Sequence, residues 1–233
     1  MLDEVKAIYP FQVFNVPEVS VWVFSVDKCK LHTNELFQFL SSDERNRVYS
    51  LRHMERRSAY IAGRALLRVL LSSVTAREVS PGEWFFEVYK HGKPRLSMLS
   101  EMEWKFSLSY TKEILAISLS ERYETGLDIE SADTIVPDII PWFLLSPGEV
   151  RVLHTLPKEE QVTYFMKIWT LKEAISKCVG SGVSLDFSTL HIDIDPLRVT
   201  ITRGDGTLNT PPLLHQEEIR IGIDRFYLSI AAM

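Results

Sequence analysis

The order of strand-like and helix-like segments predicts an α+β protein built from two similar halves, residues 1–122 and 123–233. Each half contains short apolar runs of the kind found in strands, and one long segment with apolar residues at helical spacing. No low-complexity segment or flexible linker lies between the halves. We therefore expect each half to form a small antiparallel sheet with a long packed helix, and the two halves to pack closely.

The first half is predicted to combine one long helix with several strands. Ser41 and Ser42 precede the acidic residues Asp43 and Glu44, as at a helix start, and the chain stays helical in character from there to residue 74. The apolar stripe of this helix is expected to be Ala62, Ala65, Leu66, Val69 and Leu70. Strands are expected at residues 19–26, 84–89, 106–109 and 114–119, with a turn at residues 91–94.

The second half repeats this arrangement in a different order. Residues 126–130 alternate as in a short strand. A long helix is expected from about residue 157 to residue 179, because Gly180 follows it and glycine is favoured just beyond a helix C-terminus. Further strands are expected at residues 191–194, 199–201, 219–223 and 226–231.

The composition excludes several classes of protein. A net charge of −5 is unlike that of a generally basic nucleic-acid binder. Cys29 and Cys178 are too few for a disulfide framework and lack metal-ligand spacing, as in reduced intracellular proteins. The first residues are acidic and no long apolar run follows them, so neither a signal peptide nor a membrane span is expected. These observations predict a cytoplasmic protein that binds neither nucleic acid nor membranes.

Two carboxylates in the strand at residues 126–130 are the first candidates for chemistry. Side chains alternate along a strand, so Asp128 and Glu130 share one face while Leu127 and Ile129 face the core. Their Cα atoms would lie roughly 6–7 Å apart. Two carboxylates at that distance suit a hard cation such as Mg²⁺, which binds a few carboxylates together with substrate phosphates. Equally, they are typical of the solvent face of a half-buried strand.

Charged residues also recur on the predicted helix of the second half. Trp169, Glu173 and Lys177 are spaced every four residues and share one face, with Lys172 beside them. One interpretation is an exposed ion pair between Glu173 and Lys177, worth about 0.3–0.5 kcal/mol. The other is a third acidic metal ligand flanked by two lysines that neutralise a pyrophosphate.

Together, the two segments are more specific than either alone. GLDIE at residues 126–130 and WTLKEAISK at residues 169–177 resemble the GxDxE and WxxKEAxxK motifs of the Sfp-type 4′-phosphopantetheinyl transferases. Residues 92–94 (GKP) are similar to the GKP turn of that family, and residues 106–110 (FSLSY) to its F-N-x-S-H strand. Residues 56–64 resemble its arginine-bearing helix. The resemblance covers roughly residues 40–190.

The resemblance implies both a fold and an activity. The fold would be a pseudo-dimer of two similar α+β halves with coenzyme A in the cleft between them. The activity would be Mg²⁺-dependent transfer of 4′-phosphopantetheine from coenzyme A to a serine of an apo acyl or peptidyl carrier protein, with release of 3′,5′-ADP. A chain that already holds both halves is expected to act as a monomer.

The resemblance also implies roles for individual residues. Asp128, Glu130 and Glu173 would be the metal ligands, and Lys172 and Lys177 would contact the pyrophosphate. The residues implied near the adenine are Lys93, Pro94 and Ser109. Those implied at the 3′-phosphate are Arg64, with Arg47 and Arg57 as further candidates.

The spacing of the arginines can also be interpreted without the resemblance. Arg57, Arg64 and Arg68 fall at spacings of seven and four, so they share a helical face, which suits phosphate binding but equally a solvated basic face. Tyr110 stands where the family usually has a histidine that helps to hold the phosphates of coenzyme A. Tyrosine donates a hydrogen bond but carries no positive charge at neutral pH, so weaker 3′-phosphate binding is expected.

Several alternatives stay open at this point. The serine proton would be taken by Glu173, which is preferred, or by Glu149, which matches a second glutamate of the family. The apolar residues 135–145 would either pack in the core or dock a helix of the carrier protein. A non-catalytic module that binds coenzyme A or a carrier protein is the main alternative function, and a Mg²⁺-dependent phosphohydrolase is a third.

Overall fold

A computed structural model of the chain describes residues 10, 12–16, 18–75, 79–88, 92–97, 103–132, 140–180, 185–202, 208 and 210–233. The chain divides into two compact units. Unit 1 comprises residues 1–87 and 94–122, and unit 2 comprises residues 88–93 and 123–233. The assignment of residues 88–93 to unit 2, which separates Gly92 and Lys93 of the predicted GKP turn from Pro94, was not indicated by the sequence pattern. His91 of that turn lies outside the described residues.

Unit 1 is built on a four-stranded antiparallel sheet with the strand order β1-β2-β6-β5. Its strands are β1 (Gln12–Val16), β2 (Val19–Ser25), β5 (Lys105–Tyr110) and β6 (Ile114–Ser120). The predicted strands at residues 106–109 and 114–119 are therefore present as β5 and β6, which form a hairpin in which Leu108 lies opposite Ile117. A separate two-stranded sheet consists of β3 (Phe86–Val88) and β4 (Pro94–Leu96).

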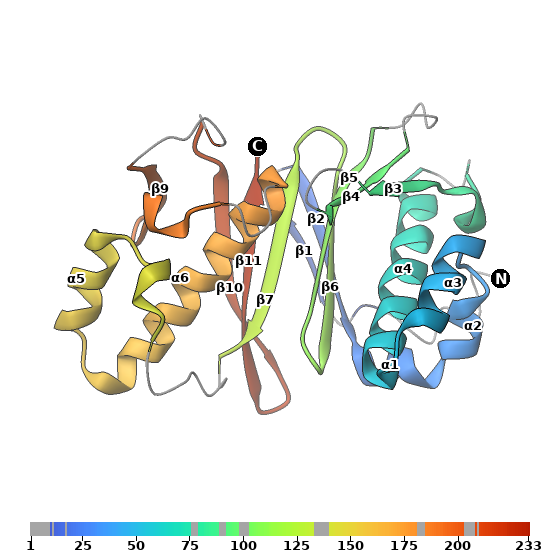
Figure 1. Cartoon of the computed structure of the whole chain (residues 1–233), viewed down its shortest axis with the longest axis horizontal. Coiled ribbons are helices and arrows are strands. Elements are labelled where there is room, and N and C mark those ends of the chain that lie inside the picture. Colours follow the sequence, from blue (N-terminus) through green and yellow to red (C-terminus); the bar gives the residue numbers. More distant parts are fainter. Residues whose placement is uncertain are drawn as a thin grey trace. The chain divides into compact units, whose positions relative to one another are not determined.

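The predicted long helix of unit 1 is two helices, because Leu51 and His53 have extended backbone angles. The described helices of this unit are α1 (Val26–Leu31), α2 (Thr33–Phe37), α3 (Ser42–Ser50), α4 (Met54–Val74) and the short 3₁₀ helix η2 (Pro81–Glu83). Helix α3 starts where expected: Ser41 and Glu44 form a capping box, in which each side chain accepts a hydrogen bond from the other residue's backbone N–H. All five residues of the predicted apolar stripe of α4 are buried, and α4 lies against the sheet (Figure 1).

Unit 2 contains a three-stranded antiparallel sheet with the order β10-β11-β7 and a separate hairpin. The sheet consists of β7 (Thr125–Ser131), β10 (Leu213–Ile221) and β11 (Asp224–Ala232), and the hairpin of β8 (Leu190–Ile194) and β9 (Leu197–Ile201). The helices are α5 (Pro147–Thr155), α6 (Lys158–Val179) and the short 3₁₀ helices η4 (Trp142–Leu144) and η6 (Phe187–Thr189).

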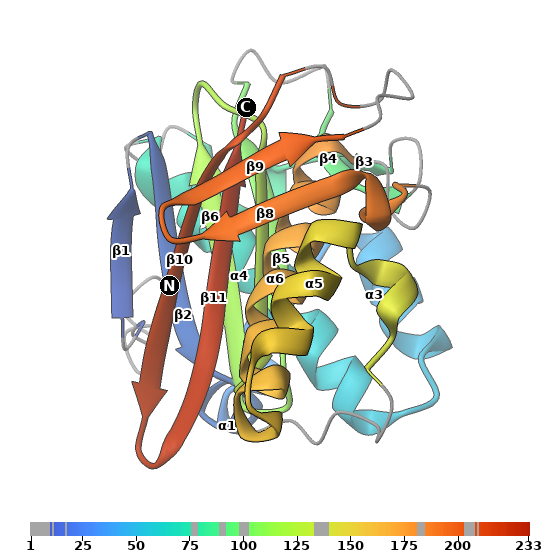
Figure 2. The same ribbon diagram turned by 90° about the vertical axis from the view of Figure 1, so that its left-hand side faces the viewer.

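Helix α6 is the centre of unit 2. It lies between the sheet on one side and a layer formed by α5 and the β8–β9 hairpin on the other (Figures 1 and 2). Its predicted C-terminal signal is present, since Gly180 has a positive φ of 69°. Helix α5 was not predicted, although Ser146 and Glu149 form a capping box and Pro147 occupies the first turn.

Each unit thus combines a small antiparallel sheet with one long helix, α4 or α6, so the predicted α+β class is confirmed. None of the described helices has both the length and the apolar character that crossing a bilayer requires.

Candidate functional site

The candidate site of unit 2 depends on how closely β7 approaches α6. A Cβ atom at Gly126 would collide with the backbone carbonyl oxygen of Ala174 and would lie 2.9 Å from the Cα of Cys178. Only glycine leaves room for this contact. The first residue of the GxDxE motif therefore lets the strand lie directly against the helix that carries the second motif.

This approach decides which face of β7 the carboxylates occupy. Asp128 and Glu130 share the face of Gly126, so they point towards α6, and Asp128 is only 4% exposed. The prediction that the two carboxylates share a face is supported. Leu127 and Ile129, on the other face, are buried as expected. Alternation did not indicate that α6 covers the carboxylate face as well, because it defines two faces but not what covers each of them.

On α6, Lys177 and Glu173 lie on the side that meets these carboxylates. The ammonium Nζ of Lys177 lies 2.7 Å from Oδ1 of Asp128, and this lysine side chain is partly exposed. The lysine therefore reaches across from the helix to the strand. Trp169, one turn before Glu173, packs against the rings of Phe165 and Phe187.

Electrostatic repulsion couples the three carboxylates. Burial, the Asp128 carboxylate and, to a lesser degree, Glu173 raise the pKa of Glu130 to about 7, while Lys177 opposes the shift. Burial and Asp128 likewise raise the pKa of Glu173, again against Lys177. Burial and repulsion from Asp128 thus both disfavour the charged forms of Glu130 and Glu173, and Lys177 offsets these shifts only in part.

An additional cation fits this group of side chains. Carboxylate oxygens are the ligands that Mg²⁺ prefers, and a divalent ion would offset both the burial and the repulsion that raise the pKa values of Glu130 and Glu173. Within the described parts of the chain, no three His, Cys, Asp or Glu side chains converge tightly enough to enclose a metal by themselves. That is consistent with Mg²⁺, which usually completes its shell with water and substrate phosphates.

Lys172 and Glu149 lie elsewhere, buried on the opposite side of α6. Nζ of Lys172 donates to Oε2 of Glu149 at 2.6 Å and to the backbone carbonyls of Leu144 and Phe187. Both side chains are essentially inaccessible, at 1% and 0% exposure. Burial lowers the pKa of Lys172, and Glu149 opposes that shift. This placement is at odds with a pyrophosphate contact for Lys172 and with a role as base for Glu149.

Most of the arginines predicted at the 3′-phosphate already have partners within unit 1. Nε of Arg64 lies 2.9 Å from Glu44, the guanidinium of the buried Arg68 binds the other oxygen of that carboxylate, and both arginines stack on Phe86. Arg57 donates to the carbonyl of Leu51. Arg47, on α3, is exposed. Sequence reasoning missed Glu44 as the partner of the arginines, although its place in a capping box was visible.

The residues predicted near the adenine have different surroundings. Nζ of Lys93 donates to the Glu124 carboxylate and to the backbone carbonyls of Thr125 and Cys178, so it ties the start of β7 to the end of α6. Pro94 begins β4 and is half-buried, and Ser109 is buried on β5. All three N–H donors of the Lys93 ammonium have acceptors within unit 2, which is at odds with the predicted role of Lys93 near the adenine.

Tyr110 lines a cavity of about 280 Å³ in unit 1 and is 58% exposed. Three cationic residues share the lining with it: Lys30, Arg56 and Lys112. Sequence reasoning did not single them out for this position, although Arg56 belongs to the arginine-bearing segment. The lining also includes Glu55, so three cationic side chains and one acidic side chain surround Tyr110, and positive charge is available from its neighbours.

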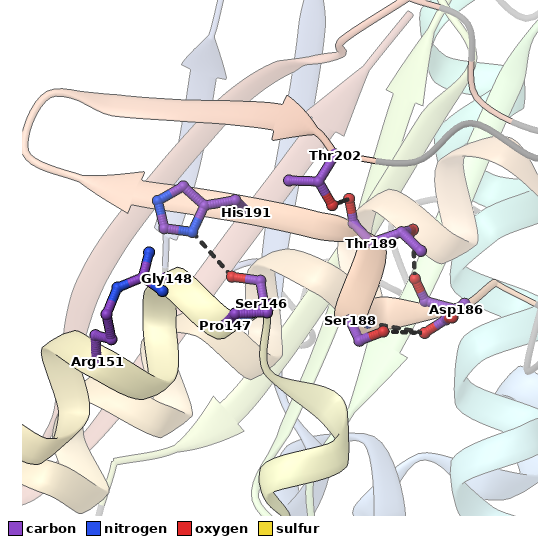
Figure 3. A pocket seen from close by; sticks show the side chains of 9 residues that line it. All are labelled: Ser146, Pro147, Gly148, Arg151, Asp186, Ser188, Thr189, His191 and Thr202. Carbon is purple, nitrogen blue, oxygen red and sulfur yellow. Dashed lines mark hydrogen bonds between the residues drawn. The ribbon is translucent and has the colours of Figure 1, made fainter.

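A second cavity, of about 510 Å³, lies at the start of α5 in unit 2 (Figure 3). There Nδ1 of His191, on β8, lies 2.9 Å from Oγ of Ser146, the residue that caps α5. The imidazole lies over Gly148, where a Cβ atom would come within 2.5 Å of the ring. This cavity adjoins the capping box that includes Glu149.

Comparisons with known proteins agree on one family. A family model described as the 4′-phosphopantetheinyl transferase superfamily matches residues 124–230. The chain is 30% identical to 4′-phosphopantetheinyl transferase HetI of Nostoc over 170 residues, covering 72% of this chain and 70% of that protein. It is 28% identical to 4′-phosphopantetheinyl transferase Sfp of Bacillus subtilis, covering 68% of this chain and 69% of that protein.

Two further matches are more partial. The chain is 35% identical to 4′-phosphopantetheinyl transferase AcpT of Escherichia coli K12, covering 58% of this chain and 66% of that protein. A solved structure, holo-[acyl-carrier-protein] synthase of Thermotoga maritima, is 18% identical with a TM-score of 0.38, covering 47% of this chain and 61% of that one. A similarity as low as the last supports no argument about the site.

Proposed function

We propose, since the chain belongs to the 4′-phosphopantetheinyl transferase superfamily and is an enzyme of that class, that it moves 4′-phosphopantetheine from coenzyme A to a serine of an apo acyl or peptidyl carrier protein. The observation that carries this proposal is the meeting of Asp128 and Glu130 with Glu173 and Lys177 across β7 and α6. The cytoplasmic location and monomeric state that the sequence indicates are part of the same proposal.

Asp128, Glu130 and Glu173 would hold Mg²⁺ in this account. When bound, the ion would neutralise charge on the pyrophosphate of coenzyme A and on the departing 3′,5′-ADP. The raised pKa values of Glu130 and Glu173 support the assignment, because burial and the neighbouring Asp128 carboxylate disfavour their charged forms and a bound cation would favour them.

Lys177 and Glu173 would supply the remaining chemistry. The serine hydroxyl oxygen forms a bond to the β-phosphorus of coenzyme A, the bond from that phosphorus to the bridging oxygen breaks, and the serine proton passes to a base. Lys177 would turn from Asp128 to the pyrophosphate. Glu173 is the proposed base, directly or through a water, because Glu149 is buried and its carboxylate already accepts from Lys172 and from two backbone amides.

For the 3′-phosphate, the cavity beside Tyr110 is a better candidate than Arg64. Lys30, Arg56 and Lys112 line it, whereas Arg64 is paired with the buried Glu44. A Tyr110 hydroxyl that donates a hydrogen bond, together with these cations, would replace the usual histidine.

For the carrier protein, η4 offers an apolar contact surface. Phe143 is 77% exposed and Trp142 stacks on His154 with 4.7 Å between the ring centroids. Of the apolar residues 135–145, those at 135–139 lie outside the described part of the chain. Exposure of Phe143 favours docking over core packing, so Phe143→Ala is expected to raise KM for the carrier while leaving coenzyme A binding unchanged.

Intact-mass spectrometry of an apo carrier protein incubated with this protein, coenzyme A and Mg²⁺ tests the proposal. We expect the carrier to gain one phosphopantetheine, and this gain to disappear with EDTA or with Asp128→Ala. Glu160→Ala, which removes an exposed carboxylate at the start of α6, is the matched control and should retain activity. Coenzyme A binding without any transfer would support the binding-module alternative, and release of free phosphate would support a hydrolase.

A further inference from the structure

Lys172 and Glu149 connect α6 to four other segments of unit 2. Lys172 reaches the carbonyl of Leu144 in η4 at 2.9 Å and that of Phe187 in η6 at 2.8 Å. Glu149, at the start of α5, accepts from the Ser146 amide at 2.7 Å and from the Ile192 amide of β8 at 2.8 Å. The hydrogen bond between Lys172 and Glu149, at 2.6 Å, joins these two sets of hydrogen bonds.

The donors and acceptors of this pair are filled within the protein. The three N–H donors of the Lys172 ammonium meet three acceptors, and both Glu149 oxygens accept from buried groups. With exposures of 1% and 0%, neither side chain has an open side towards a ligand. A phosphate could reach Lys172 only if the ammonium gave up its contacts with Glu149 and the two carbonyls, which leaves buried groups unpaired.

The position of Lys172 in the sequence gives these contacts a consequence for the site. Lys172 directly precedes Glu173, and successive side chains on a helix point about 100° apart. Fixing Lys172 against η4, η6 and α5 therefore fixes the direction in which Glu173 points. On the opposite side of α6, the contact at Gly126 fixes the distance between helix and strand. The two contacts together define both the position of α6 and its rotation about its axis.

Stability by itself does not explain a pair of this kind. A buried ion pair carries a large desolvation cost, and replacing both partners by apolar side chains of similar volume is often neutral or stabilising. What an apolar pair lacks is direction, because an ammonium that must meet three acceptors at 2.6–2.9 Å has one orientation.

We propose that Lys172 and Glu149 are positioning residues: their buried ion pair sets the rotation of α6 so that Glu173 and Lys177 face Asp128 and Glu130, and neither residue contacts coenzyme A. This inference rests on the proposed function for its effect on transfer, but not for the existence of the ion pair.

The test compares Lys172→Met, Glu149→Leu and the double variant. Urea unfolding should give a lower midpoint for each single variant and a midpoint near wild type for the double, because only the single variants leave a buried charge unpaired. Losses that simply add in the double variant would overturn the pairing. Should a single variant fail to fold, the double variant carries the remaining measurements.

The positioning role is then measured on the folded double variant. We expect Mn²⁺ affinity, followed by electron paramagnetic resonance, and kcat each to fall about 10- to 100-fold, as for other residues that orient metal ligands. The dissociation constant for coenzyme A should stay within about twofold, because lost contacts to ligand would show there first. Lys158→Met, in the exposed first turn of α6, is the control and should behave as wild type.

Two results would overturn the proposal. Wild-type Mn²⁺ affinity and kcat in the double variant would reduce the pair to a purely structural contact. A coenzyme A dissociation constant raised tenfold with Mn²⁺ affinity retained would make Lys172 a phosphate ligand after all. If the wild-type protein modifies no carrier, the proposed function fails, while the urea midpoints still decide whether Lys172 and Glu149 act as a pair.

Discussion

The two sides of α6 carry ion pairs that differ in almost every respect. Lys172 and Glu149 are sealed in the interior and every donor of the ammonium is used. Five residues later, Lys177 is partly exposed and faces a group of three carboxylates, two of which, Glu130 and Glu173, have raised pKa values. A buried pair whose hydrogen bonds are all made suits a structural role, whereas a partly exposed lysine beside three carboxylates suits the binding role proposed for it.

The same contrast exists within unit 1. Arg64 and Arg68 share the buried Glu44, while Arg56 and Lys112 line an open cavity beside Tyr110. In both units, one basic residue of a motif segment is largely buried against a carboxylate, Lys172 or Arg64, while another residue of the same segment, Lys177 or Arg56, is more exposed. Substitutions on each side of α6 and in unit 1 can test whether this contrast holds.

The largest effect is expected from replacing only one partner of the buried ion pair of Lys172 and Glu149. Lys172→Met leaves the Glu149 carboxylate buried without its counter-charge, so the free energy of unfolding should fall by about 3–5 kcal/mol. Urea denaturation measures it, with Lys158→Met as the control. A loss below about 1 kcal/mol, which is typical of exposed pairs, would remove the distinction between the two sides of α6.

Gly126→Ala should come next, because the new methyl group would collide with the backbone of α6. We expect a loss of about 1–3 kcal/mol of stability, the range for overpacking, together with loss of transfer activity as β7 moves away from the helix. Gly82→Ala is the matched control, since a Cβ atom there would meet nothing within 4 Å. Equal stabilities for the two variants would contradict the close approach described above.

Lys177→Met tests how the partly exposed ion pair of Lys177 and Asp128 differs from the buried pair of Lys172 and Glu149. Because Lys177 is partly exposed while its partner Asp128 is buried, the free energy of unfolding should fall by less than in Lys172→Met, where both partners are buried. The affinity for coenzyme A should nevertheless fall about tenfold or more, since a charge-assisted contact to the pyrophosphate is lost. Isothermal titration calorimetry at saturating Mg²⁺ gives the affinity. A stability loss without an affinity loss would reverse the assignment of the two lysines.

The smallest effects are expected in the cavity beside Tyr110. Arg56→Met and Lys112→Met should each reduce the preference for coenzyme A over dephospho-coenzyme A by a few-fold, because each removes one charge from an exposed site. Arg64→Met should instead lower stability, since it leaves Glu44 with one fewer partner. Tyr110→His should increase the preference. Should Arg64→Met alone abolish the preference, the sequence-based assignment would be restored.

Much of this protein follows from its amino-acid sequence alone. Period-two alternation placed Asp128 and Glu130 on one face, the four-residue spacing placed Glu173 with Lys177, and the capping signals located the start of α3. The two motifs, taken together, were sufficient to identify the family. These are properties of local geometry or of short motifs, so neighbouring residues suffice to specify them.

What each charge does depends instead on the tertiary structure. Lys172 meets Glu149 across 23 residues of sequence, Arg68 meets Glu44 across 24, and Lys177 meets Asp128 across 49. Whether a charged side chain on a helix is sealed or open depends on which distant segment covers that side of the helix. Local periodicity gives the direction of a side chain, whereas burial and partner arise from the packing of segments far apart in the chain.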